Sequence, residues 1–75
     1  MHEVDARGMS CPLPLLKAKK ALNAMSPGER VRVLSTDAGS VRDFHAFCEQ
    51  SGNLLLEFSC ENGVYTHVLQ KRVAG

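Results

Sequence analysis

The sequence predicts an α+β two-layer sandwich in which two helices pack on one face of a four-stranded mixed sheet. Segments with strand and helix periodicity follow one another in the order β-α-β-α-β-β. Each helix candidate carries one apolar stripe, and the strand candidates alternate between apolar and polar side chains. Such elements bury their apolar sides against each other, which gives two layers. With 75 residues, we expect a single domain covering 1–75.

The first half of the chain predicts a strand at 2–6, a helix at 12–26 and a strand at 30–36. A strand, a helix and a strand within about 35 residues form a βαβ unit, so the two strands should be parallel. The side chains expected to face the sheet fall within an arc of roughly 120° on the helix. They are Pro14, Leu15, Ala18, Ala21, Leu22 and Met25.

The second half predicts a helix that begins with Asp37 or Ser40 as its N-cap and ends at Gly52. Strands at 53–61 and 64–71 follow, joined by Asn62-Gly63, a dipeptide typical of two-residue hairpins. The tail at 71–75 should fray or complete the last strand. Two sets of side chains are expected to face the core: Val41, Phe44, Phe47, Cys48 and Ser51 on the helix, and Leu54, Leu56, Phe58 and Cys60 on the strand.

The composition is that of a soluble globular protein, with 44% hydrophobic and 23% charged residues. A net charge of +1 provides no electrostatic reason for direct nucleic-acid or acidic-membrane binding. No apolar run approaches the length of about 18 residues that a membrane span needs, and no signal peptide follows Met1. We therefore expect a cytoplasmic protein with no membrane contact.

The three cysteines show no C-x-x-C spacing, which argues against a disulfide scaffold and against a zinc ribbon. We predict no metal site and no cofactor. Cys48 and Cys60 are expected to be inert packing residues on inward faces. His45 lies at the edge of the apolar arc and is expected to be a surface histidine. Cys11 is therefore the candidate reactive residue.

Cys11 stands where the first strand candidate gives way to the first helix candidate. Gly8 can supply a positive φ in the connecting loop. Pro12 and Pro14 each fix their own φ and push the preceding residue toward an extended conformation. Cys11 is then either the N-cap, with Pro12 at the first helical position, or a loop residue before a helix that begins at Pro14. In both cases the helix dipole should favour the thiolate and lower the thiol pKa from about 8.5.

Two leucines fall outside the core-facing stripe of the first helix, on the lysine-bearing side. Together with these lysines they form a candidate partner-docking patch: Leu13, Leu16, Lys17 and Lys20. Scattered exposed leucines are also ordinary in soluble proteins. Below, the Leu13/Leu16 patch means these four residues.

One positioned cysteine without partners limits the possible chemistry. A cysteine–histidine catalytic pair needs a histidine within hydrogen-bond reach, and none stands at a motif spacing. A thiol oxidoreductase needs a resolving cysteine, whereas the other two are predicted to face the core. These observations favour a carrier, in which one thiolate accepts a group and releases it. The alternative is a non-catalytic regulatory or interaction module that uses the Leu13/Leu16 patch, with Cys11 only shaping the turn.

The pattern Gly8-x-x-Cys11-Pro12-x-Pro14, after Asp5-Ala6 and before an apolar–lysine helix, resembles the TusA/SirA-like family of small sulfur carriers. The resemblance extends over essentially the whole chain. It includes Pro27-Gly28-Glu29, Asp37, Arg42-Asp43 and Phe47-Cys48.

The resemblance implies the β-α-β-α-β-β sandwich and a persulfide on Cys11. The donor would be a cysteine desulfurase or a rhodanese-like protein, and a second protein would accept the sulfur. The chain would thus be a sulfurtransferase-type carrier rather than an enzyme with its own substrate. Known branches serve tRNA thiolation, molybdenum-cofactor enzymes or sulfur oxidation. The tRNA-thiolation branch typically has an arginine before the cysteine and an acidic residue between the prolines. Ser10 and Leu13 occupy these positions here, so we expect a carrier outside that branch.

Overall fold

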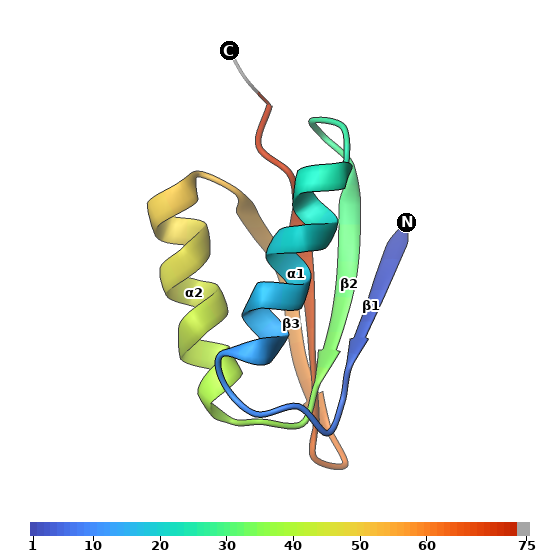
Figure 1. The fold of residues 1–75 in the computed structure, drawn as a ribbon, viewed down its shortest axis with the longest axis vertical. Coiled ribbons are helices and arrows are strands. Elements are labelled where there is room, and N and C mark those ends of the chain that lie inside the picture. Colours follow the sequence, from blue (N-terminus) through green and yellow to red (C-terminus); the bar gives the residue numbers. More distant parts are fainter. Residues whose placement is uncertain (74–75) are drawn as a thin grey trace.

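Both helices lie on one face of a four-stranded sheet in the computed structural model, which describes residues 1–73 (Figure 1). The elements are β1 (His2–Ala6), α1 (Leu13–Ala24), β2 (Arg30–Ser35), α2 (Gly39–Ser51), β3 (Leu54–Glu61) and β4 (Val64–Gln70). The strand order is β1-β2-β4-β3, with β1 parallel to β2 and the other pairs antiparallel. The predicted α+β sandwich and the parallel βαβ unit are therefore confirmed.

The core lies between the helices and the sheet. α1 contributes the predicted stripe, in which Pro14, Ala18, Leu22 and Met25 are buried. The sheet side of the core consists of Val4, Val31, Val33 and Leu69, and α2 adds Phe44 and Cys48. Burying each large apolar side chain stabilises the fold by about 1.5–3 kcal/mol. The inward assignment of Cys48 is confirmed.

Several predicted boundaries are also confirmed. Gly52 ends α2 with a φ of 82°, and its N–H donates to the Cys48 carbonyl at 3.0 Å. Asn62 and Gly63 have φ values of 51° and 77°, as a type I′ hairpin loop requires. β4 ends at Gln70, whereas Ala74 and Gly75, part of the predicted tail, lie outside the described residues.

The predicted N-cap of α2 is wrong. Ala38 occupies that position, and α2 begins at Gly39. The Asp37 carboxylate does not cap α2, because it accepts a hydrogen bond from the loop that follows β1. Ser40 is buried within the first turn, where its hydroxyl donates to the Asp37 carbonyl at 2.6 Å.

The predicted buried face of β3 is wrong as well. The register against β4 shifts between Leu55 and Glu57, so that Leu55 pairs with Leu69 but Phe58 pairs with His67. The bulge adds one residue to β3, so Leu55 and Phe58, three positions apart, pair with Leu69 and His67 on the same face of the sheet. Leu55 packs against the core instead, whereas Leu54, Leu56 and Phe58 are exposed.

Cys60 is also exposed, contrary to the prediction. It follows the bulge and pairs with Tyr65 near the hairpin end of β3, an edge strand of the sheet.

Candidate functional site

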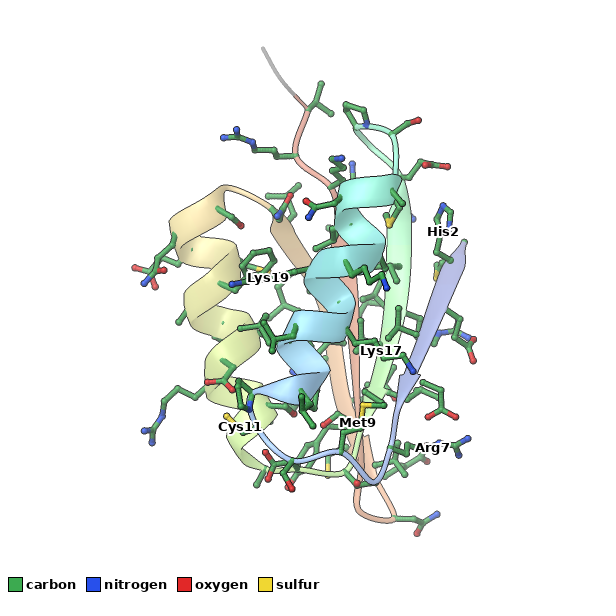
Figure 2. The ribbon with its side chains drawn as sticks, in the orientation of Figure 1. His2, Arg7, Met9, Cys11, Lys17 and Lys19 are labelled. Atoms are coloured by element: carbon green, nitrogen blue, oxygen red, sulfur yellow. The ribbon has the colours of Figure 1, made fainter. Side chains whose placement is uncertain are left out.

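Cys11 lies in the loop between β1 and α1, beside the first turns of α2 (Figure 2). Because β1 and β2 are parallel neighbours, the segments that follow them leave the same edge of the sheet side by side. Two hydrogen bonds join these segments. The Gly8 N–H donates to Thr36 Oγ1 at 2.9 Å, and the Cys11 N–H donates to Asp37 Oδ2 at 2.9 Å.

The residues around Cys11 give its loop a defined shape. Gly8 has a φ of 82°, which confirms the predicted positive φ. Pro12 is the N-cap of α1, and Pro14 is buried within the first turn. The Leu13 N–H donates to the Ser10 carbonyl at 2.8 Å. Cys11 is thus not the N-cap: it lies one residue further upstream, before a helix that begins at Leu13.

The thiol of Cys11 is held by a carboxylate from α2. Cys11 Sγ donates to Asp43 Oδ2 at 2.6 Å. This hydrogen bond, partial desolvation and the charges of Asp43 and Asp37 all raise the pKa of Cys11 above its ordinary value. A carboxylate that accepts a hydrogen bond from the thiol stabilises the neutral form of the cysteine. The predicted lowering of the thiol pKa by the helix dipole is therefore wrong.

Cys11 opens into a depression of about 750 Å³, whose other walls come from the start of α2. Its lining comprises Cys11, Ala38, Gly39, Val41, Arg42, Asp43 and His45. A Cβ atom on Gly39 would lie 3.5 Å from Cys11 Cβ and 3.2 Å from Asp37 Oδ2. The missing side chain lets α2 approach the thiol closely.

The residues Asp37 and Asp43 were missed as site residues by the sequence interpretation. Asp43 is 32 positions from Cys11 in the sequence. The apolar periodicity of the residues around Asp43 predicts a helix but does not predict a contact with Cys11. Its presence in the family pattern, within Arg42-Asp43, was the one available signal.

The Leu13/Leu16 patch extends from the site along α1. The structure leaves Leu13 51% and Leu16 52% exposed, and Lys20 is exposed too. Lys17 points toward β1, where its ammonium donates to the Asp5 carbonyl at 2.9 Å (Figure 2).

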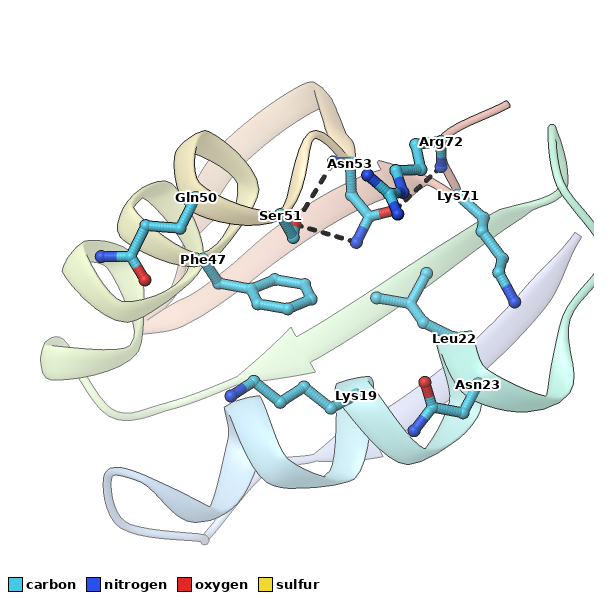
Figure 3. A pocket seen from close by; sticks show the side chains of 9 residues that line it. All are labelled: Lys19, Leu22, Asn23, Phe47, Gln50, Ser51, Asn53, Lys71 and Arg72. Carbon is cyan, nitrogen blue, oxygen red and sulfur yellow. Dashed lines mark hydrogen bonds between the residues drawn. The ribbon is translucent and has the colours of Figure 1, made fainter. Parts of the chain in front are cut away.

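A second pocket, of about 520 Å³, lies between the carboxyl-terminal halves of the two helices and does not include Cys11 (Figure 3). Both of its lysines have structural partners. Lys71 Nζ donates to the Met25 carbonyl at 2.6 Å, just beyond the end of α1. The Lys19 ammonium lies 5.3 Å from the Phe47 ring centroid. Cations near helix carboxyl ends are favoured by the helix dipole, so we assign this pocket to fold stability.

Among residues 1–73, no group of three or more histidine, cysteine, aspartate or glutamate side chains could hold a metal ion. None of the helices in this part of the chain has the length and apolar character needed to cross a membrane.

Comparison with known proteins places the chain in a family. Residues 2–71 match the family model described as sulfurtransferase TusA. The chain belongs to the TusA/SirA-like family of sulfur carriers. It is 52% identical over 70 residues to the sulfur carrier protein TusA of Allochromatium vinosum, covering 93% of this chain and 92% of that protein.

Two further relatives agree with this family. A putative sulfur carrier protein of Neisseria meningitidis serogroup A is 49% identical over 69 residues, covering 92% of this chain and 93% of the relative. The crystal structure of a SirA-like protein from Desulfitobacterium hafniense superposes with a TM-score of 0.85 at 31% identity. That match covers 97% of this chain and 100% of the other.

Proposed function

We propose that Cys11 is the residue on which this TusA-family protein carries sulfur, as a persulfide. The observation that supports it best is the position of the thiol. Cys11 is exposed, its backbone is anchored to Asp37, and it opens into a depression wide enough for another protein's reactive sulfur. Cys48 is buried, and burial raises the pKa of its thiol, which makes it a poor acceptor.

The transfer is a thiol exchange. Cys11 Sγ attacks the outer sulfur of a persulfide on the donor protein, a cysteine desulfurase or a rhodanese-like protein. A new S–S bond forms to Cys11, and the donor's S–S bond breaks with its electron pair on the donor cysteine. The reverse reaction with an acceptor thiol unloads the carrier. A reducing compartment such as the cytoplasm keeps Cys11 available as a free thiol.

The Leu13/Leu16 patch is the proposed docking surface for donor and acceptor. It begins two residues after Cys11, and its two leucines are half exposed. Ser10 and Leu13 place no charge beside the sulfur, so we propose partners other than those of the tRNA-thiolation branch.

Mass spectrometry tests the assignment of Cys11. A Cys60→Ser protein, incubated with cysteine and a desulfurase, should gain about 32 Da, the mass of one sulfur atom. The Cys60→Ser background is needed because Cys60 is exposed. The added mass should disappear in Cys11→Ser/Cys60→Ser. If the double variant still gains the sulfur, the assignment is wrong.

A further inference from the structure

We infer that Asp43 shifts sulfur exchange toward release, because its carboxylate binds the resting Cys11 thiol but repels the persulfide anion that replaces it. The inference rests on Cys11 being the carrier residue. It assigns to Asp43 a role in setting how firmly the carrier holds its sulfur.

The resting state is stabilised by a direct contact. The Cys11 thiol donates to Asp43 Oδ2 at 2.6 Å, and a hydrogen bond to a charged acceptor is stronger than one to a neutral acceptor. Asp43 lies in the second turn of α2, on a helix that is anchored in the core by Phe44. The carboxylate is thus held beside the sulfur by a rigid element, and the bond requires that the sulfur carry a proton.

The loaded state loses this contact. Cys11 Sγ in a persulfide is bonded to carbon and to the second sulfur, so it has no proton to donate. The outer sulfur of a persulfide is more acidic than a thiol and is anionic near pH 7. The new anion therefore lies next to the Asp43 carboxylate, and like charges at this separation repel one another.

The other charged and titratable groups facing the sulfur come from α2 and the segment before it. Asp37 adds a second carboxylate, whose Oδ2 binds the Cys11 N–H. Arg42 and His45 line the same depression. Within residues 1–73, Arg42 forms no ion pair with either carboxylate. Asp43 is the group in direct contact with Sγ, so its replacement isolates the effect.

Sulfur exchange between Cys11 and glutathione persulfide measures directly how far the equilibrium favours release of the sulfur. The S–S bond of glutathione persulfide breaks, and a new S–S bond forms to Cys11 Sγ. The Cys11 proton ends on the glutathione thiol. One anionic persulfide and one neutral thiol stand on each side, so the reaction requires no oxidant or reductant.

The test compares the equilibrium fraction of loaded protein at pH 7, measured by mass spectrometry in a glutathione persulfide and glutathione buffer. All proteins carry Cys60→Ser. Asp43→Asn removes the charge with little change in shape, and Asp43→Ala is the second variant. Glu49→Gln removes the same charge from an exposed position six residues further along α2 and serves as the matched control.

Asp43→Asn and Asp43→Ala should raise the loaded-to-unloaded ratio by roughly five- to tenfold, the size expected for a close pair of exposed charges. Glu49→Gln should change the ratio less than twofold. Thiolate absorbance should also show a lower Cys11 pKa in Asp43→Asn, a change that a purely structural role would not produce. A ratio in both Asp43 variants equal to or below the parent's overturns the inference while Cys11 remains the carrier. A parent protein that does not load at all overturns both.

Discussion

The backbone N–H of Cys11 donates to Asp37 Oδ2 at 2.9 Å and ties the β1–α1 loop to the segment before α2. The two residues are 26 positions apart and meet because β1 and β2 are parallel neighbours. The bond holds the backbone of Cys11, whereas Asp43 holds its side chain. Asp37 therefore fixes the backbone position of Cys11, whereas Asp43 makes the largest contribution to keeping its sulfur protonated.

Replacing Asp37 should loosen this loop. Asp37→Ala removes the acceptor and should lower the free energy of unfolding by about 1 kcal/mol. Asp37→Asn keeps a side-chain oxygen and should restore most of the loss. Hydrogen exchange of the Cys11 amide measures the effect locally and should be faster in Asp37→Ala. Unchanged protection of that amide in Asp37→Ala would show that other contacts hold the loop.

A negative charge introduced into the Leu13/Leu16 patch should block the binding of protein partners without unfolding the chain. Leu13 is 51% exposed, so Leu13→Glu should change the melting temperature little. Loading from a desulfurase should fall at least tenfold, whereas loading from glutathione persulfide should persist. Leu54→Glu is the matched control, since Leu54 is also 51% exposed but lies on β3.

Leu13→Glu and Cys11→Ser together distinguish a sulfur carrier from a non-catalytic interaction module. If Leu13→Glu abolishes partner binding while Cys11→Ser leaves the biological function intact, the protein is an interaction module. Equal desulfurase-dependent loading of Leu13→Glu and Leu54→Glu would exclude the patch as the docking surface.

Two cysteines, not one, should react with alkylating reagents in the native protein. Cys11 and Cys60 are exposed, whereas Cys48 is buried. Iodoacetamide under native conditions should therefore label Cys11 and Cys60, and label Cys48 only in denaturant. Peptide mapping after timed labelling measures the three rates. Labelling of Cys48 at a rate similar to Cys60 would contradict the burial of that thiol.

Local sequence patterns were sufficient to predict the two helices, the hairpin and the placement of Cys11 between the first strand and the first helix. Proline and glycine determine which backbone angles are accessible at their own positions, and an apolar stripe marks the buried side of a single helix. Cys60 was placed wrongly because alternation predicts which face a side chain occupies but not whether that face is covered: Cys60 lies near the hairpin end of the edge strand β3 and is exposed. The protonation of Cys11 was predicted wrongly because Asp43 reaches it from another helix, a tertiary contact that local periodicity does not reveal.

His67 is the polar side chain most at odds with its surroundings. It is fully buried on β4, and neither ring nitrogen has a hydrogen-bond partner in the described part of the chain. Its ring centroid lies 4.6 Å from Phe44 and 4.9 Å from Phe58. Burial, helped by the nearby His45, lowers the pKa of His67 from 6.5 to about 4. The folded state therefore holds the neutral imidazole.

This burial should make the fold sensitive to mild acid. Because the pKa is lower in the folded than in the unfolded chain, the unfolded chain binds more protons below pH 6.5. The contribution of His67 to stability is full above pH 6.5 and declines as the pH falls toward 4. Between pH 7 and pH 5 the loss should be about 2 kcal/mol.

Urea unfolding at pH 7 and pH 5 checks this, with His67→Phe as the test variant. Phenylalanine fits an aromatic cluster and does not titrate, so the variant should lose much less stability over this interval than the parent. His2→Gln, which removes an exposed histidine at the start of β1, should retain the parent's loss. If His67→Phe and the parent lose the same stability between pH 7 and pH 5, another group is responsible for the acid sensitivity.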